Sequence, residues 1–251
     1  KSFINAAEKS AQFIFKNLTD KNGRLIKRYR NGISGLDAHL DDYAFMIWGL
    51  LELYEATFKT SYLNQAIALN EIMIEEFWSD DGGFYLGSDK SEQLIVRSMT
   101  GYDGAIPSGN SIAAYNLLKL TRLTGEVKFA ELADKIFKVF SNEINNSPTG
   151  YTSILSAFMF ELSKPKEIVV VGPKDSKETE SALKIIKSKY IPNKVILFKD
   201  TDDKLESLTP LAKWTSSHEM INNKTTYYIC EDFSCKLPTT DIEQALKLIH
   251  E

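Results

Sequence analysis

Two stretches of the chain combine arginine, tyrosine and carboxylate or amide side chains, the residue types that bind and process sugars. Aromatic faces cover the apolar side of a sugar ring, and fixed donors and acceptors recognise its hydroxyl groups. Paired carboxylates are also the groups that glycoside hydrolysis requires. The predicted site draws on both stretches and consists of Arg28, His39, Asp41, Asp42, Tyr43, Arg97, Tyr102, Asp103, Ser108 and Asn110.

Three of these side chains are predicted to be catalytic. Asp42 and Asp103 are the expected acid and base, and His39 is a further candidate for a general base. The remaining residues are predicted to bind the substrate, with the arginines holding hydroxyl or anionic groups and the tyrosines stacking on the ring. Hydrolysis needs two carboxylates about 5–10 Å apart, whereas isomerisation needs a base that titrates near pH 7. The residue types alone fit either reaction.

A structural role for the same side chains is the alternative. Asp41, Asp42 and Ser108 stand where helix N-caps are expected. Arg28 and Arg97 are equally suited to pairing with carboxylates that fix the loops, because ion pairs also gather at such places. The two interpretations differ in geometry. Catalytic carboxylates face each other across an open cavity, whereas structural ones are occupied by helix caps and arginine pairs.

Helical spacing of apolar residues dominates as far as residue 164. Two internal matches, of 2–7 with 61–66 and of 51–66 with 118–133, give a repeat of about 60–67 residues. Each repeat is a helix pair with a short connection at one end and a long one at the other. Loops this long are usually functional, and both are expected to leave the same end. Residues 1–164 are therefore predicted to be helical hairpins of a partial α/α toroid, with small hairpins in the long loops.

The pattern changes after residue 164. The segments 168–171 and 195–198 are predicted to be parallel strands joined by a helix over 181–189, with a third strand at 226–229. A closing helix is expected from Asp241 to His250, capped by Thr240 or Asp241. Residues 165–251 are thus predicted to form a small α/β domain with a mostly parallel sheet. The predicted fold class is mainly α, with this domain following the helical hairpins.

Charge and composition narrow the possible partners. The 251 residues carry 30 basic and 34 acidic side chains, a net charge of −4, so no nucleic-acid surface is expected. No run of about 20 apolar residues predicts a membrane span. The chain begins with Lys1 inside a helical pattern and shows no signal peptide, which indicates a fragment of a longer, cytoplasmic protein. No cofactor is expected.

The two cysteines are predicted to do no metal chemistry. The spacing of Cys230 and Cys235 matches neither the redox C-x-x-C motif nor a zinc half-site. Two unpaired, partly buried thiols are the expected state in a reducing compartment, with a disulfide as the alternative.

Three motifs occur in a specific order along the chain: Leu40–Phe45, Tyr102–Ser111 and Tyr228–Asp241. They resemble the C-terminal part of the thioredoxin-domain-containing proteins related to spermatogenesis-associated protein, over essentially the whole chain. The resemblance implies a toroid similar to N-acylglucosamine 2-epimerases and six-hairpin glycosidases. It also implies that the same polypeptide holds a thioredoxin-like domain and further hairpins before this segment. His39 alone is placed to match the pocket histidines of the epimerases.

Two functions of different class follow from these observations. The first is a carbohydrate-active or sugar-binding domain, similar to a sugar isomerase, epimerase or glycosidase, with a sugar or other small molecule as its partner. The second is a non-catalytic scaffold or interaction module for the thioredoxin-like domain, because a fold does not carry a function by itself.

Overall fold

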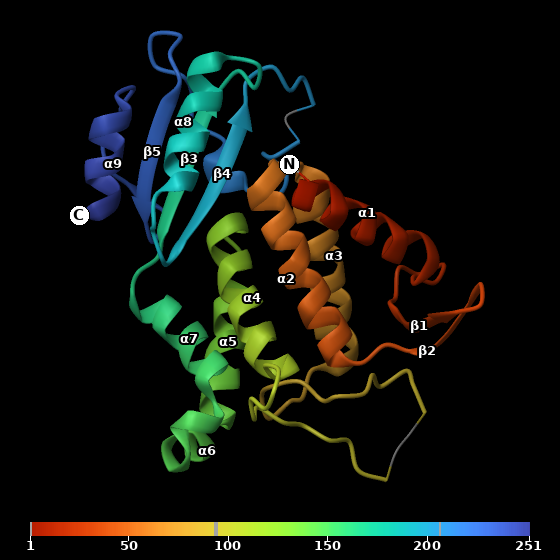
Figure 1. Cartoon of the computed structure of the whole chain (residues 1–251). Helices are drawn as coiled ribbons and strands as arrows, with labels where there is room; N and C mark the ends of the chain where they lie inside the picture. The colour runs from red at the N-terminus through yellow and green to blue at the C-terminus, as the bar shows by residue number, and fades with distance from the viewer. Residues whose placement is uncertain (1, 93–94, 206) are drawn as a thin grey trace. The chain divides into compact units, whose positions relative to one another are not determined.

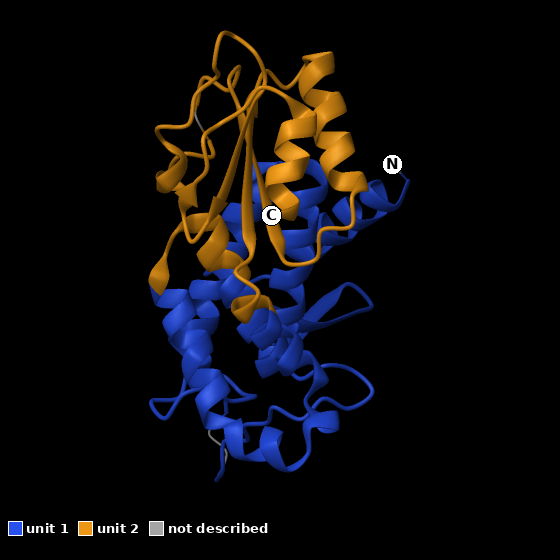
Figure 2. Cartoon of the chain, turned by 90° about the vertical axis from the view of Figure 1, so that its left-hand side faces the viewer, with its two compact units in different colours: residues 1–118, 128–159 blue, residues 119–127, 160–251 orange. Residues whose placement is uncertain are grey.

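The computed structural model describes residues 2–92, 95–205 and 207–251. The chain divides into two compact units, coloured blue and orange in Figure 2. We call the first, residues up to 118 and 128–159, the helical unit. We call the second, residues 119–127 and 160–251, the α/β unit. The fold as a whole is mixed and rich in helix.

Helix pairs build the first part of the chain, as the apolar spacing predicts (Figure 1). The turns at 58–59 and 125–126 join helices in pairs, and a long connection precedes each pair. Leu40, Tyr43, Ile47, Leu50 and Tyr54 make one buried face of α2, which packs along α3. The helices are α1 (Ser2–Asn17), α2 (Leu40–Thr57), α3 (Thr60–Phe77), α4 (Gly109–Thr124), α5 (Val127–Val139), α6 (Ser141–Asn146) and α7 (Thr152–Leu162), with the 3₁₀ turn η1 (Pro148–Gly150) after α6.

The first long connection contains the predicted small hairpin. Strands β1 (Ile26–Arg30) and β2 (Ile33–Asp37) pair in antiparallel register across Asn31 and Gly32. Both turn residues have positive φ, 53° and 80°, as a two-residue turn of this hand requires. In the described part of 79–107, by contrast, the strand-like pairing is the isolated bridge from Trp78 to Phe84. The hairpin expected in the second loop is therefore reduced to this bridge.

The α/β unit has a four-stranded sheet in the order β4-β3-β5-β6 (Figure 1). Its two central strands, β3 and β5, are buried almost throughout, which explains the valine and isoleucine run of β3. The strands are β3 (Lys166–Gly172), β4 (Lys194–Asp200), β5 (Thr226–Glu231) and β6 (Ser234–Cys235). The helices are α8 (Lys177–Ser188), α9 (Ile242–His250) and the 3₁₀ turn η2 (Lys213–Thr215). The Asp241 side chain accepts the backbone N–H groups of Glu243 and Gln244, which confirms it as the cap of α9.

The sheet is mixed, and the prediction of a mostly parallel sheet is wrong. β3 and β4 are parallel with α8 between them, as predicted, but β5 runs antiparallel to β3 and to β6. A parallel pair needs a crossover connection that returns to the end of the sheet where the first strand began. The connection between β4 and β5 makes no such crossover. Thr226 pairs with Val171, next to Gly172, which pairs with Asp200, so β5 begins at the end of the sheet where β3 and β4 finish. The tight turn after β5 then forces β6 to run antiparallel.

The α/β unit also includes residues 119–127, the last turns of α4 and the start of α5. Arg122 and Leu123 join this segment to the rest of the α/β unit. The Leu123 carbonyl, for example, accepts the ring N–H of Trp214. The boundary expected at residue 164 is based on the change of pattern along the chain. It therefore leaves residues 119–127 out of the α/β unit. Across the described residues, no helix combines the length and apolarity that a membrane crossing requires.

Candidate functional site

Asp41 and Asp103 both meet the N-terminus of α4. The Asp41 carboxylate accepts the Gly109 backbone N–H, and burial raises its pKa. The two Asp103 oxygens accept the backbone N–H groups of Ser108 at 2.9 Å and Ser153 at 2.7 Å. The two long loops therefore reach the same end of the helical unit, as expected, and Figure 1 shows the hairpin and the described part of the second loop there. Both carboxylates are engaged by backbone donors.

His39 and Asp42 lie at the start of α2. An Asp42 oxygen accepts the His39 backbone N–H at 2.8 Å, an arrangement that closes the first turn of the helix. The His39 ring nitrogen Nδ1 lies 2.9 Å from Lys27 Nζ, on the exposed side of the hairpin. Asp42 thus performs the capping role that the sequence offered as an alternative.

The second loop is held by its own polar side chains. Asn110 accepts the Phe84 N–H and donates to the carbonyls of Phe84 and Thr100, at 2.8–3.0 Å. The Ser108 hydroxyl accepts the Ser111 N–H, the hydrogen bond of an N-cap. Buried hydrogen bonds of this kind fix a loop of irregular backbone against the helices.

Arg28, Arg97 and Tyr102 take no part in the hydrogen bonds just described. Arg97 donates to the carbonyls of Glu76 and Gly87, and its guanidinium lies 4.2 Å from the centre of the Tyr85 ring. Arg28 is exposed on β1, and Tyr102 is exposed while packing edge-on against Tyr151. The sequence-predicted residues are thus gathered at one end, and most of them hold backbone.

A pocket of about 230 Å³ opens at this end of the helical unit. It lies between the hairpin, the start of α2, the end of α3 and residues 88–91. Tyr43 is the member of the predicted set that lines it. Its hydroxyl accepts the Leu25 N–H at 2.9 Å, and burial raises the pKa of Tyr43 to about 12. The walls are formed by Asp20, Arg24, Leu25, Ile26, Gly35, Leu36, Asp37, Ala38, Tyr43, Glu76, Phe77, Ser88, Lys90 and Ser91.

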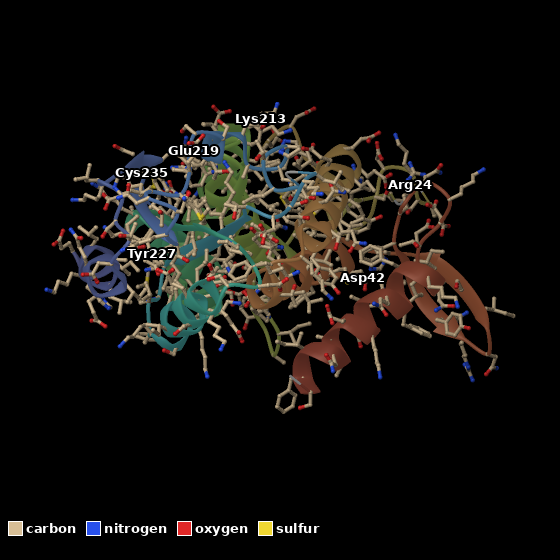
Figure 3. All side chains as sticks on the ribbon, turned by 90° about the horizontal axis from the view of Figure 1, so that it is seen from above. Arg24, Asp42, Lys213, Glu219, Tyr227 and Cys235 are labelled. Atoms are coloured by element: carbon tan, nitrogen blue, oxygen red, sulfur yellow. A yellow bond between two sulfur atoms is a disulfide. The ribbon has the colours of Figure 1, made fainter. Side chains whose placement is uncertain are left out.

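Glu76 is the residue that connects the two loops in this pocket. Its carboxylate is 5% exposed, and it lies 2.5 Å from Arg24 Nε of the first loop. The other oxygen accepts the Ser88 hydroxyl of the second loop at 2.8 Å. Figure 3 labels Arg24 and Asp42, which come from the first loop and the start of α2. The pocket thus combines fixed charges with the apolar surface of Leu36 and Tyr43, the pattern of a small-molecule site.

Sequence reasoning missed Glu76 although a signal was present. The buried positions of α3 include Leu69, Met73, Glu76 and Phe77, which follow helical spacing. A carboxylate on that buried face must be paired, because an unpaired buried charge is costly. The sequence does not identify its partner, Arg24, which lies in a different loop.

Leu36 at the rim of this pocket has φ of 67°, a left-handed conformation that costs a side chain of this kind about 1–2 kcal/mol. Asparagine tolerates that conformation better. Because Leu36 is 62% exposed, Leu36→Asn loses little burial. We expect it to raise the free energy of unfolding by about 1 kcal/mol in urea titrations. The control is Ile33→Asn, at an exposed position of β2 without positive φ. Equal effects of the two substitutions would show that Leu36 is not strained.

No family model matches the chain. Human spermatogenesis-associated protein 20 is 31% identical over 258 residues, which cover 98% of this chain and 33% of the human protein. The rat protein of the same name is 32% identical over 99% of this chain. An uncharacterised protein of Caenorhabditis elegans is 29% identical over 99% of this chain. The chain is homologous to part of spermatogenesis-associated protein 20. It spans about a third of the length of these curated relatives.

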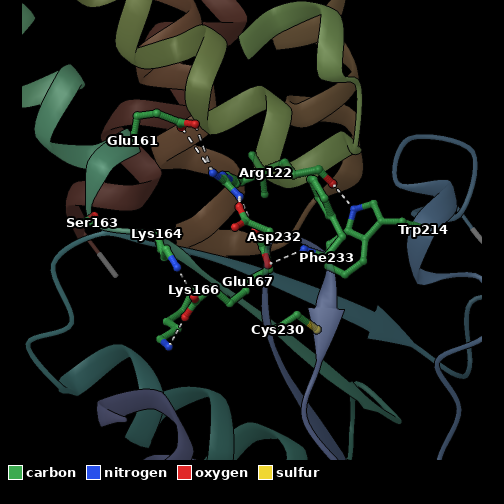
Figure 4. Close-up of polar contacts among 12 residues, drawn as sticks. Arg122, Glu161, Ser163, Lys164, Lys166, Glu167, Trp214, Cys230, Asp232 and Phe233 are labelled. Carbon is green, nitrogen blue, oxygen red and sulfur yellow. Dashed lines mark hydrogen bonds and ion pairs between the residues drawn. The ribbon is translucent and has the colours of Figure 1, made fainter.

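The similarity to spermatogenesis-associated protein 20 runs through both units, and the α/β unit contains a buried cluster of charged side chains. Arg122 is almost fully buried there, and it contacts carboxylates of Glu161, Glu167 and Asp232 (Figure 4). Glu167 is 0% exposed and lies 3.2 Å from Arg122. Burial raises the pKa of Glu167, and the charge of Arg122 opposes that rise. This cluster holds the end of α4 to the start of β3.

The expectation of two unpaired thiols is wrong, because Cys230 and Cys235 form a disulfide. They are directly opposed in the β5–β6 ladder, and the turn between them brings their side chains together. The disulfide that the sequence left as the alternative is the state that the structure shows. Figure 3 labels Cys235 and draws the disulfide in yellow. Among the described residues, the two cysteines and His218 form the group of three neighbouring side chains whose types (His, Cys, Asp or Glu) can bind a metal.

Proposed function

We propose that the helical unit binds a small polyhydroxylated ligand of the carbohydrate class in the pocket beside Glu76. The observation that supports this most is the buried Glu76 carboxylate held between Arg24 and Ser88, one from each long loop. Fixed acceptors and donors read hydroxyl groups, while Leu36 and Tyr43 offer apolar surface to the ring. The charged side chains of the pocket are already held in place by one another, so they do not need to move when a ligand enters.

The proposal includes the larger setting that the resemblance implies. The helix pairs would be part of an α/α toroid completed by hairpins elsewhere on the polypeptide, with a thioredoxin-like domain alongside. The chain spans about a third of its curated relatives, which leaves room for both.

Binding without catalysis is favoured over an isomerase, epimerase or glycosidase reaction. Asp42 and Asp103 accept backbone N–H groups, and His39 lies beside Lys27. These contacts are those of a carboxylate that holds a helix or loop, and they favour a structural role over proton transfer. This observation also supports the second candidate function, an interaction module whose helical unit presents a rigid surface to the rest of the polypeptide.

Glu76→Gln tests the sugar pocket, because it removes the charge and keeps the shape. We expect the unchanged chain to bind members of a library of mono- and disaccharides in ligand-detected NMR. Glu76→Gln should weaken that binding at least tenfold, about 1.4 kcal/mol. The control is Glu71→Gln on the same helix, where the exposed carboxylate pairs with Lys128. It should bind as the unchanged chain does.

Two results would reject the pocket. One is the absence of any saccharide binding by the unchanged chain, which would leave the interaction module as the better function. The other is equal affinity of Glu76→Gln and Glu71→Gln, with both variants shown to be folded by near-ultraviolet circular dichroism.

A further inference from the structure

The disulfide at the β5–β6 hairpin has two unequal sulfur atoms. Cys230 lies on β5 and is 1% exposed. Cys235 lies on β6, the edge strand of the sheet, and is half-buried. Cys235 is therefore the more exposed of the two residues, and a reagent from solvent meets it before Cys230.

A histidine lies against the more accessible sulfur. The His218 Nε2 atom is 3.4 Å from Cys235 Sγ. A histidine nitrogen and the two sulfur atoms lie within 4.8 Å of one another. His218 is 6% exposed, and its Nδ1 makes no hydrogen bond of normal geometry to the described residues. A buried nitrogen without a hydrogen bond of normal geometry calls for an explanation, and a redox or catalytic role is one.

The aromatic rings around His218 fix its position. The Tyr228 ring centre lies 4.1 Å away and the Trp214 ring centre 5.6 Å away. The imidazole is thus held beside the sulfur atoms and shielded from water. A proton carrier at this distance is correctly placed for thiol chemistry, in which the thiolate is the nucleophile.

The geometry points to a thiol–disulfide exchange site formed by Cys230, Cys235 and His218, which accepts two electrons from low-molecular-weight or protein thiols. The site lies in the α/β unit and does not rest on the sugar pocket. His218 contacts a reacting sulfur, and its role is to carry the proton between the incoming thiol and the sulfur that leaves.

The exchange proceeds in two balanced steps. The incoming thiol R–SH gives its proton to His218, and its sulfur attacks Cys235 Sγ. The Cys230–Cys235 bond breaks, a Cys235–S–S–R bond forms, and Cys230 leaves with the electron pair and takes the proton. A second thiol then attacks the sulfur of R and its proton passes to Cys235. The products are R–S–S–R and two cysteine thiols.

The surroundings of His218 keep the imidazole neutral and able to accept that proton. Burial lowers its pKa, and the charge of Lys199 on β4 lowers it further, while the Thr215 backbone opposes these effects. Lys199 Nζ donates to the carbonyls of Thr215, Ser216 and His218, which holds the cation behind the ring. Tyr228 of β5 also faces the imidazole, and the Cys235 sulfur of β6, which does not titrate while it is in the disulfide, lies against its Nε2 atom.

Reduction of the folded chain by glutathione tests the site. The folded chain is incubated with reduced glutathione and EDTA, and the free thiols are trapped with a maleimide and counted by intact mass. We expect reduction well before unfolding, and His218→Asn should slow it by about tenfold or more. The slowed variant should also lose the part of the pH dependence of the rate that is due to His218, which is expected below pH 6.5 because burial lowers the pKa of His218. His250→Asn, at the end of α9, is the control and should react as the unchanged chain does.

A second comparison does not depend on the histidine. With oxidised glutathione, Cys230→Ser should form a mixed disulfide faster than Cys235→Ser, because it retains the accessible sulfur. Equal rates in these two variants would overturn the proposal. Reduction that is no faster than unfolding, or an unchanged rate in folded His218→Asn, would also overturn it and show a purely structural disulfide.

Discussion

Arg122→Met should destabilise the α/β unit by about 3–5 kcal/mol. The substitution removes the positive charge that faces Glu167, which is 0% exposed and lies 3.2 Å away. The carboxylate is then left buried and uncompensated, and this costs more than the lost attraction itself. Urea unfolding at pH 7, followed by the circular dichroism of the sheet, measures the change.

The same substitution should show a characteristic dependence on pH. Burial already raises the pKa of Glu167, and without Arg122 the main opposition to that rise is lost, leaving the hydrogen bond from the Phe233 N–H. The folded state then holds a proton that the unfolded state releases above its own pKa of about 4.3. The variant should therefore recover stability as the pH falls toward 4.5 and lose it as the pH rises through the folded-state pKa.

Lys166→Met is the control for this experiment. Lys166 pairs with the partly exposed Glu231 at 2.8 Å, and such pairs contribute about 1 kcal/mol or less. Equal losses in Arg122→Met and Lys166→Met would contradict a special role for the buried pair.

Asp103→Asn should lower the free energy of unfolding by about 2 kcal/mol, although it changes few atoms. Both Asp103 oxygens accept backbone N–H groups, from Ser108 and Ser153. An amide offers one acceptor oxygen, so its NH₂ group must face one of those donors. For a chain of this size, the melting temperature should fall by roughly 4–8 °C.

Asp89→Asn provides the comparison for Asp103, because its carboxylate is exposed and pairs with the neighbouring Lys90. It should change the free energy of unfolding by less than about 0.5 kcal/mol. If Asp103 served only to bind a ligand, Asp103→Asn would melt like this control, and the structural role described above would be wrong.

Local patterns in the sequence predicted most of the fold. Apolar spacing located α2 and α3, and β-branched runs located β3 and β4 with α8 between them. The shared end of the long loops followed from the alternation of short and long connections. These features depend on neighbours along the chain, and such signals are the strongest that one sequence carries.

The parts that could not be predicted depend on partners far apart in the chain. Arg122 stands on a helix and resembles a solvated side chain until its contact with Glu167 is known. Glu76 meets Arg24 across two elements, and Cys230 meets Cys235 only because β6 folds back on β5. Spacing identifies the face on which a residue lies, but it does not identify what covers that face.

The discontinuous make-up of the α/β unit has a consequence for how the chain folds during synthesis. Residues 119–127 are made well before the strands that they join, and Arg122 must wait for Glu167 to emerge. The helix pairs rest on local contacts, which form early, whereas this long-range contact closes late. A fragment of residues 160–251 expressed alone would contain Glu167 without its cation, so the sheet should fail to fold until the α4 segment is supplied.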